Sequence, residues 1–200
     1  MQKQKPDQQG LYQLAEAQAG YFSSKQAHDF GFSRDLLSHL VSSGKFLRSG
    51  HGVYRFRAFP EMPWSEYYQV WIATGMKAVF SHRSALALYE LTDLIPTEFH
   101  VTVSRPSRKS LENVRYHTAA LRAGEIATRH GLPLTDVPRT LYDLYRWGES
   151  PEWIAQATLQ ALERGLLSED RLMERIEIYS KTFRKLIQNI LKKGRVEIQQ

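Results

Sequence analysis

The chain has 200 residues, of which 42% are hydrophobic and 24% charged, and it contains no cysteine. This apolar fraction supports ordinary folded cores, and the lack of cysteine excludes disulfides, thiol catalysis and thiolate metal sites. No apolar run is long enough to cross a bilayer and the first residues do not form a secretory signal, so we expect no membrane partner and a cytoplasmic location.

Basic and acidic residues alternate in blocks along the chain. The formal net charge is +6, and residues 1–60, 99–124 and 181–200 carry net charges of +4, +4 and +5, separated by acidic stretches. Three separate basic blocks predict localised contact with a polyanion rather than a uniformly basic surface.

Residues 11–43 predict three short helices, with Ser23 and Ser33 as N-caps of the second and third. The third helix carries an apolar stripe that anchors it to its own domain. A recognition helix needs this division, because polar side chains near its N-terminus must reach base edges in the major groove. A solvated helix surface would have a similar composition. The expected DNA contacts on its outward face are Arg34, Ser38, His39 and Ser42.

A glycine-cornered β-hairpin is expected next. Its strands are residues 45–48 and 53–56, and the turn between them is rich in glycine. Between Gly44 and Arg57 the chain has four basic side chains and no acidic one, which favours contact with DNA phosphates. The expected contacts of this hairpin are Lys45, Arg48, His51 and Arg55.

Helix, glycine, basic strand, glycine-rich turn and return strand follow in the order of a winged helix-turn-helix domain. Three motifs, Gly20-Tyr21-Phe22, Ser33-Arg34 and Gly50-His51-Gly52-Val53-Tyr54-Arg55, resemble the N-terminal domain of the AbiEi-type antitoxins of type IV toxin-antitoxin systems. The resemblance implies a DNA-binding antitoxin that represses its own promoter.

The proline-rich residues 60–63 are the expected domain boundary. Helices are expected over 64–74 and 84–91, with Ser81 as the cap of the second. The segment SHRSALALYEL, residues 81–91, resembles the start of the second domain of the same family. Because His82 has no partner at the spacing of a metal ligand, we assign it to capping and packing and expect no metal site.

A strand over residues 99–104 is expected to pair with residues 114–117 as a hairpin. The connection between them holds three basic residues, Arg105, Arg108 and Lys109. They could form a second nucleic-acid contact or a solvated loop, and the sequence leaves both open.

The segment LPLTDVPRTLYDL, residues 132–144, resembles a signature of the family that joins a strand to a helix. Asp143 in this signature is expected to form a salt bridge along the helix with Arg139 or Arg146. Two more helices should follow. The last helix, over 181–193, is amphipathic and basic, and it could pack on its own protein or bind a protein, an RNA or an anionic surface.

Motifs of nucleotide-binding enzymes, serine hydrolases and zinc proteases are absent from the sequence. Metal-dependent nucleases need several converging carboxylates. Residues 99–124, which contain the expected strands, have Glu112 as their only acidic residue. We therefore expect no catalytic residue, no cofactor and no enzymatic activity.

These features predict an α+β protein, a winged helix-turn-helix followed by a mixed helical domain with a small sheet. The expected parts are a flexible arm (1–10), the DNA-binding domain (11–60), the second domain (61–180) and the basic helix (181–200). The resemblance implies binding to double-stranded DNA at the protein's own promoter repeats and action against a nucleotidyltransferase-like toxin. Two copies on repeated half-sites would help one winged helix per chain, which favours a dimer or cooperative binding on DNA. Two alternatives stay open, a transcriptional regulator whose second domain binds a ligand or partner, and an RNA-binding accessory protein.

Overall fold

The computed structural model of the chain describes residues 5–91, 97–106 and 111–197. Its first helices begin at residues whose side chains act as N-caps. Ser23 and Ser33 accept hydrogen bonds from the backbone N–H groups of Gln26 and Leu36, and each such cap is worth about 1 kcal/mol. Both predicted serine caps are therefore confirmed. The three helices are α1 (Gln8–Glu16), α2 (Ser24–Asp29) and α3 (Arg34–Ser42).

An antiparallel sheet of three strands follows these helices, in the order β1-β3-β2. The strands are β1 (Tyr21–Ser23), β2 (Phe46–Gly50) and β3 (Val53–Phe56). Strands β2 and β3 form the predicted hairpin, and the pairing register shifts between Arg48 and Gly50 near the turn. Strand β1 was not predicted, because its three residues are too few to show an alternating pattern.

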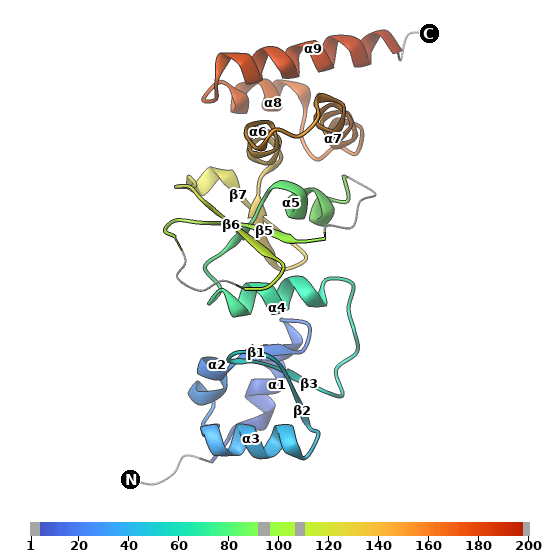
Figure 1. Cartoon of the computed structure of the whole chain (residues 1–200). Coiled ribbons are helices and arrows are strands. Elements are labelled where there is room, and N and C mark those ends of the chain that lie inside the picture. Colours follow the sequence, from blue (N-terminus) through green and yellow to red (C-terminus); the bar gives the residue numbers. More distant parts are fainter. Residues whose placement is uncertain (1–4, 92–96, 107–110, 198–200) are drawn as a thin grey trace. The chain divides into compact units, whose positions relative to one another are not determined.

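The two faces of this sheet pack against different helices. Alternation along the strands places Phe22 and Tyr54 on one face and Tyr21 and Arg55 on the other. Phe22 belongs to a core shared with α1, α2 and α3, whereas helix α4 (Ser65–Ala73) contacts β1 and β3. Figure 1 shows α4 on one side of the sheet and α1 and α3 on the other.

The chain divides into two compact units. The N-terminal unit comprises Met1–Ala78 with His130–Leu132, and the C-terminal unit comprises Val79–Arg129 with Pro133–Gln200. The N-terminal unit thus extends past the proline-rich residues 60–63 and includes α4. Each unit combines helices with its own small sheet, which confirms the predicted α+β class.

The C-terminal unit contains a five-stranded sheet in the order β6-β5-β4-β8-β7. Strand β4 is antiparallel to β5 and parallel to β8, so the sheet is mixed. A short 3₁₀ helix, η1 (Ala123–Glu125), leads into β7. The strands are β4 (Val79–Phe80), β5 (Phe99–Val103), β6 (Val114–Thr118), β7 (Ile126–Arg129) and β8 (Leu132–Thr135).

Strands β5 and β6 are parallel, so the expected hairpin between them is wrong. Phe99 pairs with Val114, and Val103 pairs with Thr118. The ten residues between the strands exceed a tight turn and can span about 33 Å when extended. They can therefore bring the chain back to the start of β5, whose five residues cover only about 16 Å.

Helices α6 to α9 pack together in the C-terminal unit (Figure 1). Asp136, Ser150 and Ser168 accept the capping hydrogen bonds of α6, α7 and α8. The helices of the unit are α5 (His82–Tyr89), α6 (Val137–Trp147), α7 (Pro151–Glu163), α8 (Glu169–Ile176) and α9 (Lys181–Glu197).

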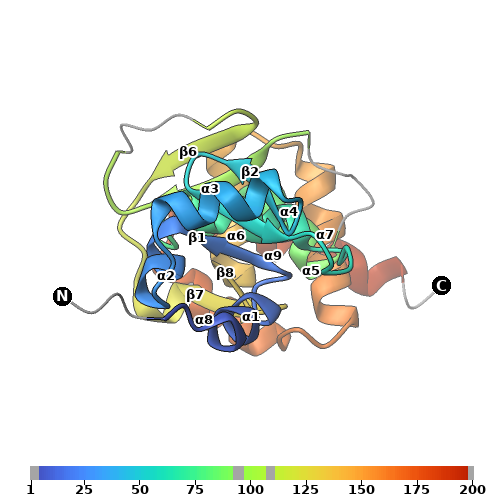
Figure 2. The ribbon, with the colours of Figure 1, turned by 90° about the horizontal axis from the view of Figure 1, so that it is seen from below.

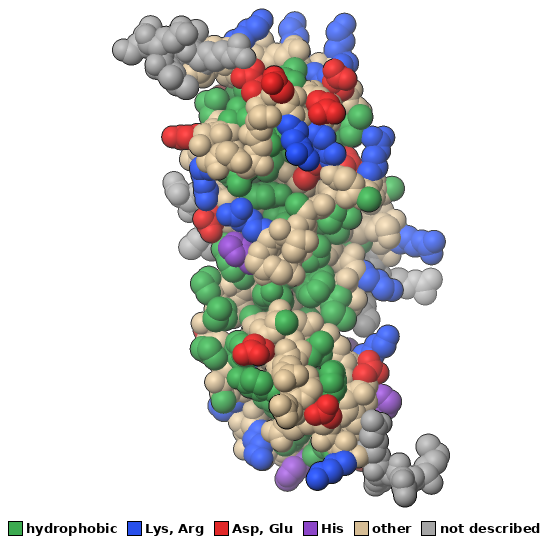
Figure 3. All heavy atoms as spheres, turned by 180° about the vertical axis from the view of Figure 1, so that it is seen from behind, with side chains coloured by type: hydrophobic (Ala, Val, Ile, Leu, Met, Phe, Trp, Pro, Cys, Tyr) green, Lys and Arg blue, Asp and Glu red, His purple; other side chains and the backbone are tan. Residues whose placement is uncertain are grey.

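The basic helix α9 packs its apolar side on its own protein. Phe183 and Ile187 are fully buried, and α9 contacts α7. Lysines such as Lys185 remain exposed. Basic side chains project from the end of the C-terminal unit that carries α9 (Figure 3). Over the described ranges, no helix combines the length and apolar character that crossing a membrane requires.

Candidate nucleic-acid interface and histidine cluster

The polar residues predicted on α3 are all exposed: Arg34, Ser38, His39 and Ser42. The Ser38 hydroxyl donates to the Arg34 carbonyl oxygen over 3.0 Å, and the Ser42 hydroxyl donates to the His39 carbonyl oxygen over 2.9 Å. Because both hydroxyl protons are used within the helix, Arg34 and His39 are its freer hydrogen-bond donors. Figure 2 looks onto α3 and shows β2 beside it.

A groove lies between α2, the N-terminal part of α3 and the β2–β3 hairpin, with a volume of about 460 Å³. Arg34 of α3 lines it together with Arg48 and His51 of the hairpin. None of the lining residues in the described part of the chain is acidic. The groove therefore joins helix and hairpin into one concave, positively charged surface, which suits a phosphate backbone.

Three of the four hairpin residues predicted to contact DNA are exposed, namely Lys45, Arg48 and His51. Basic and histidine side chains are visible around the α3 end of the N-terminal unit in Figure 3. The structure thus leaves these three side chains accessible to a ligand at the hairpin.

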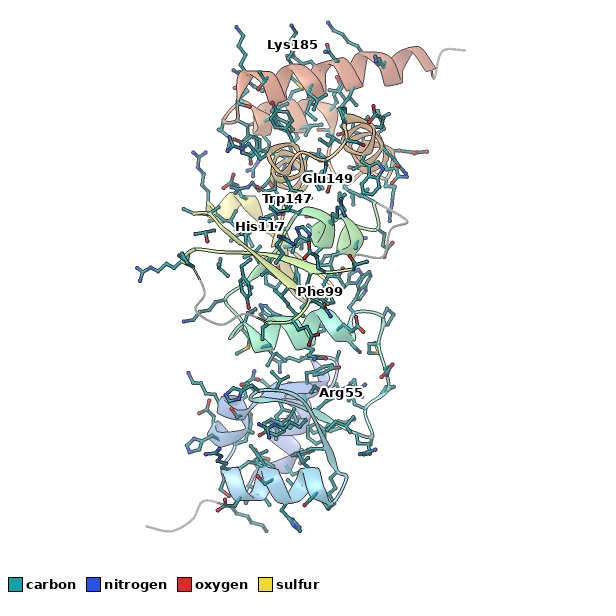
Figure 4. The ribbon with its side chains drawn as sticks, viewed as in Figure 1. Arg55, Phe99, His117, Trp147, Glu149 and Lys185 are labelled. Atoms are coloured by element: carbon teal, nitrogen blue, oxygen red, sulfur yellow. The ribbon has the colours of Figure 1, made fainter. Side chains whose placement is uncertain are left out.

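Arg55 corrects the sequence-based prediction, because it is only 5% exposed and cannot reach a DNA phosphate. Its guanidinium lies on the α4 face of the sheet, where Nη2 donates to the carbonyl oxygens of Phe59 and Pro60, each over 2.9 Å. Its Cζ atom lies 5.4 Å from the ring centre of Tyr21. Figure 4 shows Arg55 beside the chain that leaves β3. Arg55 therefore fixes the end of the hairpin.

The second predicted basic patch is described only in part. Arg105 follows β5 and is exposed. Arg108 and Lys109 lie outside the described residues, so their contribution stays a prediction.

A cluster of three histidines lies in the C-terminal unit, formed by His82, His100 and His117. One ring nitrogen from each lies within 4.8 Å of the others. His100 Nδ1 is 3.0 Å from His117 Nε2, and the His82 ring stacks on the His117 ring with centroids 3.7 Å apart. The Trp147 ring is nearly perpendicular to the His117 ring, with centroids 5.0 Å apart, and both residues are labelled in Figure 4.

The parallel pairing of β5 and β6 brings the cluster together. His117 pairs with Thr102, whose neighbours two positions away along β5 share its face, so His100 and His117 point to the same side. His82 is the first residue of α5 and has a positive φ of 52°, a conformation in which histidine is enriched. The His100 backbone N–H donates to Ser84 Oγ over 2.8 Å and ties β5 to α5.

Ser81 makes no side-chain cap on α5, which corrects its predicted role. Its Oγ lies 2.9 Å from His82 Nδ1 and accepts a hydrogen bond from Thr102 Oγ1 over 2.8 Å. Ser81 therefore orients the His82 ring instead of capping α5.

Sequence reasoning treated His82 as a lone histidine and missed His100 and His117. The assumption that His82 has no partner at ligand spacing is wrong, because the fold places His100 and His117 within ligand distance of His82. The available signal was that one histidine lies in each of two expected strands, His100 in β5 and His117 in β6. That signal becomes informative only with the parallel register of β5 and β6.

Burial keeps the histidine rings of the cluster neutral. It lowers the pKa of His82 to about 2, and the neighbouring His117 and His100 rings and the Arg139 guanidinium lower this pKa further. Burial likewise lowers the pKa of His117 to about 4 and shifts the pKa of His100 downward. Each neutral ring has one nitrogen with a lone pair, and the 3.0 Å hydrogen bond between His100 Nδ1 and His117 Nε2 uses one of these lone pairs.

The LPLTDVPRTLYDL segment forms a buried ionic network at the start of α6. Arg139 Nε is 2.8 Å from Asp143 Oδ1, which confirms the predicted helix salt bridge, and Arg139 Nη1 is 3.3 Å from Glu125 Oε1. Burial raises the pKa of Asp143 to about 6 in spite of Arg139. Asp143 Oδ2 is buried without a hydrogen-bond partner among the described residues.

We predict that Arg55→Ala lowers the free energy of unfolding of the N-terminal unit by about 1.5–3 kcal/mol, because it removes buried hydrogen bonds from a charged donor. Arg48→Ala, which removes an exposed arginine from the same hairpin, should change it by less than about 0.5 kcal/mol. Urea unfolding of both variants measures the difference. Equal stability of the two variants would contradict the anchoring role of Arg55.

We also predict that the C-terminal unit loses stability as the pH falls from about 6.5 to about 4. Histidine in the unfolded chain has a pKa of about 6.5, so it binds a proton below that pH. The buried His82 ring of the folded protein stays unprotonated in the same pH range. The unfolded state therefore binds more protons, and the free energy of unfolding decreases as the pH falls. The decrease is at most about 1.4 kcal/mol per pH unit for this ring.

His82→Asn tests this pH dependence, since asparagine also tolerates a positive φ. Denaturant unfolding at several pH values, with a chelator present, should show a shallower decrease than in the wild type. His130→Asn removes an exposed histidine that also has a positive φ and serves as the control. An unchanged slope in His82→Asn would contradict the account.

The sequence model for transcriptional regulators of the AbiEi antitoxin type matches residues 10–57 of the chain. The match covers the capped helices, the three-stranded sheet and the groove between helix and hairpin. A search of curated proteins for relatives of the chain gives no match. Residues 10–57 are thus similar to the AbiEi antitoxin type of transcriptional regulator, the family that their motifs resemble.

Proposed function

We propose that the N-terminal unit binds double-stranded DNA at repeats in the protein's own promoter and so represses its own operon. The observation that carries this proposal is the groove that Arg34, Arg48 and His51 share, which is open and has no acidic lining residue in the described part of the chain. The match of residues 10–57 to the model of a family of transcriptional regulators supports it.

In this proposal α3 enters the major groove and the hairpin lies along the phosphates. Arg34 and His39, as the exposed donors of α3, contact base edges, with Ser38 and Ser42 as acceptors. Arginine is well suited to this role because it can pair with two acceptors of guanine. Two copies of the chain on adjacent repeats would supply the affinity that one small module lacks.

The C-terminal unit, in the same proposal, counters a nucleotidyltransferase-like toxin. Support comes from the family match of residues 10–57 and from the SHRSALALYEL and LPLTDVPRTLYDL segments, which form α5 and the start of α6. The neighbouring open reading frame separates this proposal from a regulator with a ligand-binding second domain. An antitoxin should be encoded beside a nucleotidyltransferase-like gene, and an isolated gene would oppose the proposal.

Arg48→Ala should weaken binding to all duplexes about equally and lower the slope of log affinity against log salt concentration by about one, because one phosphate contact is lost. Arg55→Ala should leave this slope unchanged, since its guanidinium is buried. Fluorescence anisotropy at four salt concentrations measures the slope. An Arg48→Ala slope equal to that of the wild type would rule out the hairpin contact.

Lys185→Ala distinguishes this function from an RNA-binding accessory protein. Lys185 is exposed on α9, in the third basic block of the sequence (Figure 4). If the α3 groove alone binds nucleic acid, the slope of log affinity against log salt concentration is the same for Lys185→Ala as for the wild type. A reduced slope would favour nucleic-acid contact by several basic blocks.

Arg34→Ala should reduce the preference for the protein's own upstream DNA over an unrelated duplex by about 1–3 kcal/mol, the value of one good base contact. Competition experiments with the two duplexes give this quantity directly. A uniform loss of affinity for both duplexes would assign Arg34 to the phosphates instead.

The full-length Arg34→Ala/Arg48→Ala variant should still rescue growth when it is co-expressed with the neighbouring toxin, while a reporter from its promoter is derepressed. Point substitutions suit this test better than a deletion of residues 1–60, because α4 packs on β1 and β3 and would lose its support. Failure of a folded variant to rescue growth would contradict the division of labour between the two units.

A further inference from the structure

The histidine cluster of the C-terminal unit has the spacing of a metal site. Two nitrogens bound to one tetrahedral zinc ion, each at about 2.0–2.1 Å from the metal, lie about 3.3 Å apart. His100 Nδ1 and His117 Nε2 are 3.0 Å apart, and a ring nitrogen of His82 lies within 4.8 Å of both. The three nitrogens are therefore close enough for one ion, but the His82 ring stacks on His117 with 18° between the ring planes. His82 must rotate out of this stack before its lone pair and that of His117 can point at the same ion.

We propose that His82, His100 and His117 bind one Zn²⁺ ion in the C-terminal unit. Imidazole nitrogen is a preferred ligand of zinc, and three histidines are a common protein contribution to a zinc site. This site is independent of the proposed DNA contacts, which lie in the N-terminal unit.

The partners of the opposite ring nitrogens support the assignment. A histidine that binds metal through one nitrogen almost always donates the N–H of the other to an oxygen, which fixes its tautomer. His82 Nδ1 lies 2.9 Å from Ser81 Oγ, and His100 Nε2 lies 3.4 Å from Glu98 Oε1. These contacts leave His82 Nε2 and His100 Nδ1 for the ion, beside His117 Nε2.

The position of His82 on α5 gives a second structural reason to assign metal binding to the cluster. Its φ of 52° is unusual for a residue with a side chain, and such strain is concentrated at functional sites. This conformation starts α5 at His82 and lets its ring stack on His117.

The site also has room for a fourth ligand. His82 and His117 line an open cavity of about 570 Å³ together with Arg139, Asp143 and Arg146. Three protein ligands with an open fourth position are the arrangement in which zinc holds water or an anionic ligand. The two arginines favour an anion at that position.

Zinc retention by the full-length protein tests the proposal. The protein is treated with EDTA, dialysed, mixed with excess ZnCl₂ and passed through a desalting column, and its metal content is measured by mass spectrometry. We expect one zinc per chain in the wild type and in His130→Asn, which removes an exposed histidine outside the cluster. A wild-type protein that retains no zinc would overturn the proposal.

His117→Asn should weaken zinc affinity by more than about 100-fold in titrations against a competing chelator, because a lost ligand costs more than a lost outer partner. Ser81→Ala, which removes only the oxygen beside His82 Nδ1, should weaken it by about 10- to 100-fold. Wild-type affinity in a folded His117→Asn variant would show that zinc binds elsewhere and would refute the site.

Cobalt provides a readout that does not depend on the folding of any variant. Co²⁺ replaces Zn²⁺ in such sites, and tetrahedral Co²⁺ absorbs visible light much more strongly than octahedral aqueous Co²⁺. Titration of the wild type with CoCl₂ should produce this absorption with an endpoint at one equivalent, and added Zn²⁺ should abolish it. A spectrum of aqueous Co²⁺ throughout the titration would contradict the proposed coordination.

Discussion

The contact among Phe22, Phe46 and Phe56 determines the geometry of the N-terminal unit. Their ring centroids lie 4.8 to 5.3 Å apart, and they belong to one buried cluster with residues of α1, α2 and α3. Because these rings come from all three strands, the cluster holds the hairpin and α3 in one packed body. The groove that carries Arg34, Arg48 and His51 exists only while this packing holds.

The three-stranded sheet of the N-terminal unit places the groove-lining residues on one face and the residues that support the fold on the other. Alternation along β3 turns Tyr54 toward the groove and Arg55 toward α4, although the two residues are adjacent in sequence. In the C-terminal unit, the parallel register of β5 and β6 has an equivalent effect, because it places His100 and His117 beside His82. In both units the strand register decides which polar side chains can act together.

Local signals in the sequence predicted much of the first 60 residues, since caps and glycine turns act over a few positions, as at Ser23 and Ser33. They could not predict the burial of Arg55, because its hydrogen bonds to the Phe59 and Pro60 carbonyl oxygens and the packing of α4 on β3 depend on the path of the chain after the hairpin. They also could not place His100 beside His117, because pairing across the ten-residue connection sets that contact. Long-range pairing, rather than propensity, accounts for the misses.

Nuclear magnetic resonance of the labelled protein, titrated with a duplex of its own upstream DNA, tests the central claim most directly. The account predicts that the largest chemical-shift changes fall on α3 and on the β2–β3 turn, with the Arg34 and Arg48 signals among them. Signals of α9 should change little. Large changes confined to α9 or to residues 99–106, with α3 unaffected, would contradict DNA binding through the N-terminal unit.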